Sequence, residues 1–331
     1  MSHVALDPST DVRAAGTRSN VAIDVIDLVK QFGHNRALDG VTFQVPRGSV
    51  FGVIGPNGAG KTTIMRALLD IIRPTSGQAM VLGTPTRNAG PDLRRRIGYL
   101  PGELILEGRT SGRRLLAHYA DISGPVEAGH VNELAERLGL DLDRPVRKLS
   151  KGNKQKLGIV QAFMHQPELL VLDEPTSGLD PLMQQEFLKM VREAQARGQT
   201  IFLSSHVISE IQQAADEVAI LRDGRIVTIN TVDELRTTAI RHLRLVATGI
   251  RPTDLAAVLG ALEGVTTIEC TLTPAGDAEA VATLSGEIAP FVQVISTLQL
   301  KDLMLEEPDL EESVLKLYSA PTPPNTAAAT T

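Results

Sequence analysis

The feature that most constrains the fold is a glycine-rich segment between a short apolar run and a stretch with helical spacing. The apolar run, Ser49–Ile54, is rich in β-branched residues and predicts a buried strand. The helical stretch, Ile64–Leu69, contains no helix breaker. Between them, Gly55–Thr63 reads GPNGAGKTT and fits the pattern G-x-x-x-x-G-K-[ST]. A loop between a strand and a helix N-terminus presents backbone N–H groups and the positive end of the helix dipole to an anion, so this segment predicts an α/β fold with a phosphate site.

The residue types in this loop suit a nucleotide. Glycines let the backbone close around phosphates where a Cβ would obstruct it. Lys61 can reach the β- and γ-phosphates, and the Thr62 hydroxyl can bind Mg²⁺. The alternative is a glycine-rich turn that contains Lys-Thr by chance, and the flanking strand and helix favour the phosphate loop. The loop residues expected to contact nucleotide are Gly55, Asn57, Gly58, Ala59, Gly60, Lys61, Thr62 and Thr63.

A second chemical element follows the apolar run Leu169–Leu172, which is typical of a strand buried on both faces of a parallel sheet. The run ends in Asp173-Glu174. One carboxylate at such a strand end, beside a phosphate loop, can hold Mg²⁺ through water, and its neighbour can polarise the water that attacks the γ-phosphate. A solvated strand end is the alternative. In the same chain as the phosphate loop, we expect Asp173 and Thr62 at the metal and Glu174 as a catalytic residue.

Composition narrows the remaining function classes. A chain of 331 residues suggests one large or two moderate domains. The formal net charge of −6, the absence of Trp and the scarcity of aromatic residues argue against a nucleic-acid binder. The single cysteine, Cys270, excludes an intramolecular disulfide and favours a reducing compartment. We find no apolar run of about 18 residues, so no membrane span is expected.

The chain predicts four regions. Residues 1–20 are expected to form a disordered leader, 21–230 a nucleotide-binding domain, 231–319 a small accessory domain, and 320–331 a disordered tail rich in Pro, Thr and Ala. Within the second region, Val21–Leu28 alternates as an edge strand does, and about 103–166 has helical spacing typical of a separate subdomain.

The accessory region predicts a small α+β domain. The expected order is compatible with a β-α-β-β-α-β, ferredoxin-like arrangement. One further short helix is expected at Leu310–Tyr318. The expected strands are Leu243–Ala247, Val265–Leu272, Ala280–Leu284 and Phe291–Ile295, with helices at Thr253–Leu262 and Ser285–Pro290.

From Val21 to Asn230, the chain resembles the ATP-binding subunits of ABC transporters. Leu149–Asn153 (LSKGN) matches the family's L-S-G-G-Q signature, and Ser177–Asp180 (SGLD) matches its D-loop. His206, after LSS, matches its switch histidine. The resemblance implies a P-loop NTPase of ABC type, with a RecA-like core, an antiparallel β subdomain and a helical subdomain.

The resemblance also assigns roles and partners. It implies that two chains, identical or different, sandwich two ATP molecules with Mg²⁺ and drive a separately encoded transmembrane permease from the cytoplasmic face of the cell membrane. It implies no nucleic-acid partner. Catalysis would fall to Glu174 and His206. The added nucleotide contacts would come from Phe32, at the adenine-stacking position, and from Ser150, Gly152, Asn153 and Asp180. Taken singly, Phe32 is equally well explained by core or turn packing. His206 taken singly is better explained as a strand-end histidine with its hydrogen bonds satisfied, and the other motifs favour the functional role.

The chain departs from the family pattern at two places. The family has a glutamine after a Tyr-hydrophobic-Pro segment, where this chain has Gly102-Glu103. Glycine offers no ligand, so either Glu103 or water would take the place of the glutamine at Mg²⁺. In the signature, Lys151 adds a positive charge and Asn153 carries an amide one methylene shorter than glutamine.

The C-terminal stretch Glu306–Glu312 (EEPDLEE) resembles the ending of ATPases from ABC-2-type exporters of drugs and antibiotics. A plain helix N-terminus explains the same acidic residues. A soluble ABC ATPase acting on ribosomes or DNA is the main alternative, although the chain shows one nucleotide domain and no extended heptads. A P-loop kinase is the third candidate, but that class needs no signature segment.

Overall fold

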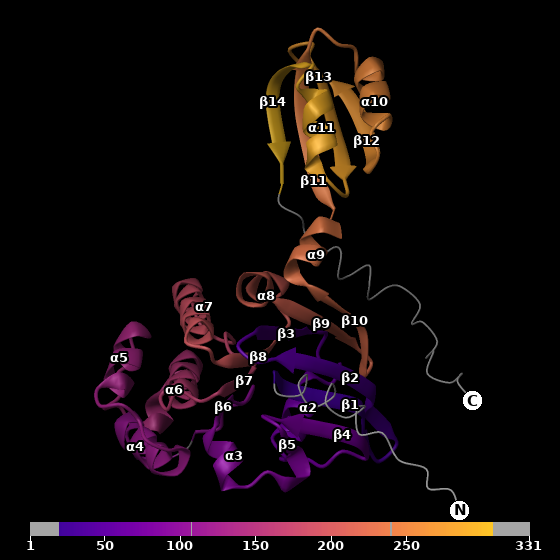
Figure 1. The fold of residues 1–331 in the computed structure, drawn as a ribbon. Helices are drawn as coiled ribbons and strands as arrows, with labels where there is room; N and C mark the ends of the chain where they lie inside the picture. The colour runs from indigo at the N-terminus through magenta and orange to yellow at the C-terminus, as the bar shows by residue number, and fades with distance from the viewer. Residues whose placement is uncertain (1–19, 107, 239, 307–331) are drawn as a thin grey trace, which may run out of the picture. The chain divides into compact units, whose positions relative to one another are not determined.

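The computed structural model describes residues 20–106, 108–238 and 240–306 (Figure 1). The described residues divide into two compact units, here called the N-terminal and C-terminal units, with the boundary in the sequence between Ile229 and Asn230. The expected leader (except Asn20), the expected tail and the helix expected at 310–318 lie outside the described residues. No helix among the described residues is both long enough and apolar enough to cross a membrane.

A six-stranded sheet forms the centre of the N-terminal unit, in the order β10-β9-β3-β8-β7-β6. Strand β3 pairs in parallel with both β8 and β9, and β7 pairs in parallel with β8 and β6. The carboxyl ends of β3, β7 and β8 therefore meet at one edge of the sheet. The six strands are β3 (Val50–Ile54), β6 (Ile97–Leu100), β7 (Leu169–Asp173), β8 (Thr200–Ser205), β9 (Glu217–Arg222) and β10 (Arg225–Thr231).

A second, antiparallel sheet has the order β2-β1-β4-β5. The prediction of an edge strand at Val21–Leu28 is wrong, because β1 pairs with β2 on one side and β4 on the other. Alternation predicts which face a strand buries, but it carries no information on how many neighbours the strand has. The four strands are β1 (Val21–Phe32), β2 (Asn35–Pro46), β4 (Ser76–Val81) and β5 (Thr84–Pro85).

Three buried phenylalanines join the two sheets. The Phe43 ring of β2 stacks 5.6 Å from both the Phe51 ring of β3 and the Phe202 ring of β8, measured between ring centroids. Stacked aromatic rings combine a large buried area with a defined geometry. This contact fixes β3, and with it the loop that follows β3.

Several helices pack against strands of the central sheet. Others form the region that the sequence predicts to be helical (Figure 1). Helices α4, α5 and α6 fall within 103–166, and α6 leads directly toward β7. The helices of this unit are α2 (Lys61–Leu68), α3 (Pro91–Arg95), α4 (Gly112–Ser123), α5 (His130–Arg137), α6 (Lys151–Phe163), α7 (Pro181–Ala196) and α8 (Ile208–Ala214), with short 3₁₀ turns η2 (Thr86–Asn88) and η3 (Val146–Lys148).

The C-terminal unit is an antiparallel sheet in the order β12-β13-β11-β14. Helices α10 and α11 pack their apolar residues on the same face, against alternate residues of β11 and β13. The element order is β-α-β-β-α-β after an initial helix. The elements are α9 (Val232–Thr238), β11 (Arg241–Thr248), α10 (Pro252–Gly260), β12 (Val265–Leu272), β13 (Ala278–Leu284), α11 (Ile288–Ile295) and β14 (Gln299–Leu305).

The last two elements differ from the sequence prediction. Phe291–Ile295 was expected to be a strand but lies in α11, and the strand is β14. Phe291 and Ile295 are buried at helical spacing while Val292 between them is 47% exposed. A short run rich in β-branched residues fits a buried strand or helix equally well, so its composition was misleading.

Arg137 ties helix α5 to α7. Its Nε donates to Glu186 Oε1 at 2.8 Å, and its two Nη atoms donate to the two Glu193 oxygens at 2.7 and 2.9 Å. This hydrogen bonding, together with the positive charge, holds the pKa of Glu193 below its ordinary value of 4.5. A carboxyl group whose pKa is lowered by folding stabilises the folded state at pH values above its unfolded pKa. This stabilisation is lost as the pH falls through the lower pKa of the folded state.

We predict that Arg137→Met lowers the free energy of unfolding by about 1–2 kcal/mol at neutral pH, because two carboxylates lose charge-assisted hydrogen bonds. Urea denaturation followed by circular dichroism measures this loss. The difference from wild type should shrink below about pH 4.5 as Glu193 becomes protonated. Arg144→Met is the matched control, because its exposed pair with Asp141 should contribute less than about 0.5 kcal/mol. An equal effect of both substitutions would contradict the prediction.

Candidate nucleotide-binding site

The phosphate loop begins where β3 ends, and its glycines are required by close contacts. A Cβ on Gly55 would lie 2.5 Å from the Leu221 carbonyl oxygen. Gly60 caps α2 with a left-handed φ of 113°, and a Cβ there would lie 2.7 Å from the Ala37 carbonyl oxygen. Helix α2 starts at Lys61, earlier than the expected Ile64, so Lys61, Thr62 and Thr63 form its first turn. N–H groups in a first turn have no intrahelical partner and are available to an anion.

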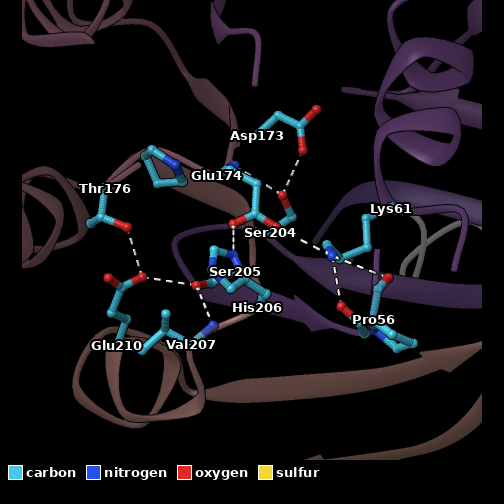
Figure 2. Close-up of polar contacts among 12 residues, drawn as sticks. Pro56, Lys61, Asp173, Glu174, Thr176, Ser204, Ser205, His206, Val207 and Glu210 are labelled. Atoms are coloured by element: carbon cyan, nitrogen blue, oxygen red, sulfur yellow. Dashed lines mark hydrogen bonds and ion pairs between the residues drawn. The ribbon is translucent and has the colours of Figure 1, made fainter. Parts of the chain in front are cut away.

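Lys61 is held within this loop, with only 6% of its side chain exposed. Its Nζ donates to the Gly55 carbonyl oxygen at 2.6 Å and lies 3.5 Å from that of Pro56 (Figure 2). The same atom lies 3.2 Å from Glu174 Oε1. Because a buried ammonium needs acceptors, these two carbonyl oxygens and this carboxylate compensate the burial of Lys61.

Asp173 forms the centre of a compact oxygen cluster and is 1% exposed. Thr62 Oγ1 donates to Asp173 Oδ2, and Ser204 Oγ donates to Asp173 Oδ1, each at 2.7 Å. Ser204 Oγ in turn accepts from the Glu174 N–H at 3.1 Å. Hydroxyl and carboxylate oxygens are ligands that Mg²⁺ prefers, so the donors at this corner fit the predicted metal.

Glu174 lies between Lys61 and His206. The Glu174 Oε2 atom is 2.6 Å from His206 Nδ1. The backbone of Glu174 has a φ of 48°, in the left-handed region. Although Glu174 Oε1 lies within ion-pair distance of Lys61, it is buried without hydrogen-bond geometry to any described residue. A carboxylate oxygen with a free lone pair beside a phosphate loop can accept a proton from water.

The signature segment packs against the D-loop of the same chain. Ser150 caps α6 by accepting from the Asn153 N–H at 3.3 Å, and a Cβ on Gly152 would lie 2.6 Å from the Gly178 carbonyl oxygen. Asp180 caps α7 by accepting from the Met183 N–H at 3.0 Å. Among the described residues, no hydrogen bond joins Ser150 or Asn153 to the phosphate loop.

Gln155, which the sequence analysis missed, ties α6 to the segment that follows β7. It is 3% exposed, and its amide donates to the carbonyl oxygens of Pro175 at 2.9 Å and Glu174 at 3.3 Å. Ser204 was missed as well. The pair of serines at the end of an apolar strand was the available signal for Ser204, whereas nothing in the spacing distinguished Gln155.

Gly102 and Glu103, which stand where the family has its glutamine, have different surroundings in the structure. Gly102 lies against Asp173, since a Cβ there would be 3.1 Å from Asp173 Oδ2. Glu103 instead lines a groove with Arg94 and Ile122. Phe32 ends β1 with 49% exposure, and Lys30 Nζ lies 4.7 Å from its ring centroid. Its π-face therefore already attracts one cation.

Comparison with known proteins agrees with this geometry. The family profile described as "ABC transporter" matches residues 38–177. The bacitracin transport ATP-binding protein BcrA of Bacillus licheniformis is 38% identical over 217 residues, which span 65% of this chain and 71% of that protein. The daunorubicin resistance ATP-binding protein DrrA3 of Streptomyces coeruleorubidus is 33% identical over 306 residues, which span 90% of this chain and 96% of that protein.

A solved structure titled "Structure of ATP binding subunit of ABC transporter" is 32% identical, with a TM-score of 0.61 over 65% of this chain and 92% of the other. The predicted fold class, a P-loop NTPase of ABC type, is confirmed. The chain belongs to the ATP-binding subunits of ABC transporters.

Proposed function

We propose that this chain binds and hydrolyses ATP as the subunit that drives an ABC exporter. The observation that carries the proposal is one cluster at the edge of the central sheet, where Lys61 and His206 each contact Glu174 and Thr62 contacts the adjacent Asp173. A cation, two metal-binding oxygens, a carboxylate with a free lone pair and an imidazole are the groups that phosphoryl transfer to water needs.

Each residue then has one task. Lys61 exchanges the Gly55 and Pro56 carbonyl oxygens for the β- and γ-phosphates, and the loop N–H groups bind the remaining phosphate oxygens. Thr62 and Asp173 hold Mg²⁺, which neutralises phosphate charge when bound. Glu174 takes a proton from water as the water oxygen bonds to the γ-phosphorus and the bond to the bridging oxygen of ADP breaks. His206 holds Glu174 and senses the γ-phosphate.

We further propose that two chains close over two MgATP molecules. Ser150, Gly152 and Asn153 form a helix N-terminus that is not bonded to the described phosphate loop of its own chain. Such a terminus attracts anions, and it completes the site if it faces the γ-phosphate held by a neighbour. Asp180, at the adjacent turn, would approach the same nucleotide, and Phe32 would stack on the adenine.

The groove beside α4 is the proposed docking site of a separately encoded permease. It has a volume of about 900 Å³ and contains Ile105, 79% exposed, and Ile122, 56% exposed. Large exposed apolar side chains in a groove mark interaction sites. Docking would keep this chain at the cytoplasmic face of the membrane as a peripheral subunit. Export is supported by the name of a further relative, the Nod factor export ATP-binding protein I of Rhizobium meliloti, which is 36% identical over 63% of this chain and 64% of that protein.

The remaining assignments rest on the same proposal. Residues 231–319 would form an accessory domain with ferredoxin-like connectivity, attached to the nucleotide-binding domain 21–230. At the metal, Gly102 leaves room for water in place of the family's glutamine, and Glu103 remains the alternative ligand. A soluble ATPase that acts on ribosomes or DNA stays the rival, and co-purification decides between them.

We predict that Glu174→Gln lowers ATP turnover by about 10²–10⁴-fold while nucleotide binding persists, because the amide cannot take the proton from water. Phosphate release measures turnover, and sedimentation with MgATP should show a trapped dimer. Glu127→Gln, an exposed carboxylate away from the site, is the control. Turnover at the wild-type rate in Glu174→Gln would falsify the assignment of the base.

We predict that Gly152→Ala abolishes ATP-driven dimerisation, because the added Cβ would collide with the Gly178 carbonyl oxygen. Binding of one nucleotide per chain should persist, since the phosphate loop is untouched. Sedimentation in the Glu174→Gln background separates the two effects. Gly90→Ala is the matched control, because a Cβ at Gly90 meets nothing within 4 Å. A stable dimer of the Gly152→Ala variant would contradict the sandwich arrangement.

We predict that Ile105→Glu prevents recovery of a polytopic membrane protein from detergent-solubilised membranes of the source organism. The charge would have to be buried in an apolar contact. The ATPase rate of the isolated chain should stay within about twofold of wild type, because Ile105 does not touch the nucleotide cluster. Ile26→Glu, at 48% exposure on the antiparallel sheet, is the control. Recovery of ribosomes or DNA with the wild type would support the rival function.

A further inference from the structure

Glu210 is a buried carboxylate that the mechanism above does not use. It lies on α8 with 8% of its surface exposed. Among the described residues, no lysine, arginine or histidine forms an ion pair with it. Burial of a carboxylate is costly unless hydrogen bonds compensate it, so the partners of Glu210 indicate what the charge does.

Both partners come from the segments that carry the catalytic pair. Glu210 Oε2 accepts from Thr176 Oγ1 at 2.7 Å and from Ser205 Oγ at 2.8 Å (Figure 2). Thr176 lies in the segment that follows Glu174, and Ser205 directly precedes His206. Ser205 Oγ also accepts from the Val207 N–H at 2.9 Å, so the backbone is held on both sides of His206.

Glu174 needs such support, because its left-handed φ of 48° is unfavourable for a residue with a side chain. A backbone in this region persists only where its surroundings hold it. Ser204 holds the Glu174 N–H, Gln155 holds the carbonyl oxygens that follow, and Glu210 holds Thr176. Ser204 lies on β8, the strand that leads to His206, and therefore ties that strand to Glu174 directly. Of the three side chains, Glu210 alone lies outside both segments and binds each of them.

We propose that Glu210 is a positioning residue that keeps the switch histidine in register with the catalytic carboxylate. One oxygen binds both segments, so His206 Nδ1 stays at 2.6 Å from Glu174 Oε2. The inference rests on the proposed function, since it assigns a purpose to the Glu174–His206 contact. Charge-assisted hydrogen bonds are shorter and stronger than neutral ones, which suits a carboxylate to this task.

The test compares Glu210→Ala with Glu210→Gln. We expect Glu210→Ala to lower kcat for MgATP by about 10–100-fold, because a small displacement of the base and its partner is enough to slow the reaction. The Kd for nucleotide should change by less than about threefold, since the phosphate loop is not involved. Glu210→Gln keeps an amide oxygen that can accept from both hydroxyls, so it should recover most of the lost rate. Ser205→Ala should add little to the loss when combined with Glu210→Ala.

Rates are normalised to the nucleotide sites counted by titration, so a partly unfolded preparation cannot imitate the effect. Ser209→Ala, an exposed neighbour on α8, is the control and should behave as wild type. Wild-type kcat per site in Glu210→Ala would overturn the inference, as would an alanine variant whose loss glutamine fails to restore. If wild type hydrolyses ATP and Glu174→Gln does not, either of these outcomes overturns the role of Glu210 and leaves the proposed function intact. If wild type shows no hydrolysis, both the inference and the proposed function fail.

Discussion

The parallel pairing of β3, β8 and β7 is the constraint on which the site depends. In this pairing Ile54 lies opposite Ser205, and Ser204 lies opposite Asp173, so three strand ends stop at one level. The chain leaves β3 into the phosphate loop, β7 into Glu174 and β8 into His206. Residues far apart in the sequence are thus brought together by the backbone hydrogen bonds of the sheet. The stacked rings of Phe43, Phe51 and Phe202 pack β3 and β8 against β2 and so support this arrangement.

The cluster also explains how the site can hold buried charges before nucleotide binds. Lys61 balances Glu174, and the hydroxyls of Thr62 and Ser204 satisfy Asp173. Each of these contacts replaces one that the substrate or Mg²⁺ would make. Binding therefore exchanges internal partners for external ones, and the net affinity is the difference between the two sets. Movement of Lys61 toward a phosphate would break its ion pair with Glu174 Oε1, an oxygen that accepts no hydrogen bond from a described residue, and would so link phosphate binding to the proposed base.

The sequence predicted which residues gather at this edge, because phosphate loops and acidic strand ends depend on local order along the chain. Gly55, Lys61 and Asp173 each have a role that the neighbouring residues already indicate. Other features depend on packing between distant segments, which spacing does not encode. Gly102 contacts Asp173 while Glu103 turns to the groove, and β1 acquires two neighbours instead of one. Likewise, the role proposed for Glu210, a polar residue in a short helix, could not be predicted from its neighbours in the sequence. It depends on contacts with Thr176 and Ser205, which lie outside that helix.

The contacts of α6 have a consequence for a closed pair of chains. Gln155 binds the Glu174 and Pro175 carbonyl oxygens of its own chain, while Ser150 and Gly152 begin the same helix. In the proposed sandwich that helix N-terminus faces the nucleotide of the neighbour. A shift of α6 on contact with one γ-phosphate would then reach, through Gln155, the base that acts on the other. The close approach of Gly152 to Gly178 adds a second link, because the turn it touches leads to Asp180 and α7. In such a pair, α6 of each chain would connect the nucleotide bound by the neighbour to Glu174 of its own chain. This connection would give the two nucleotide sites a physical means of coupling hydrolysis.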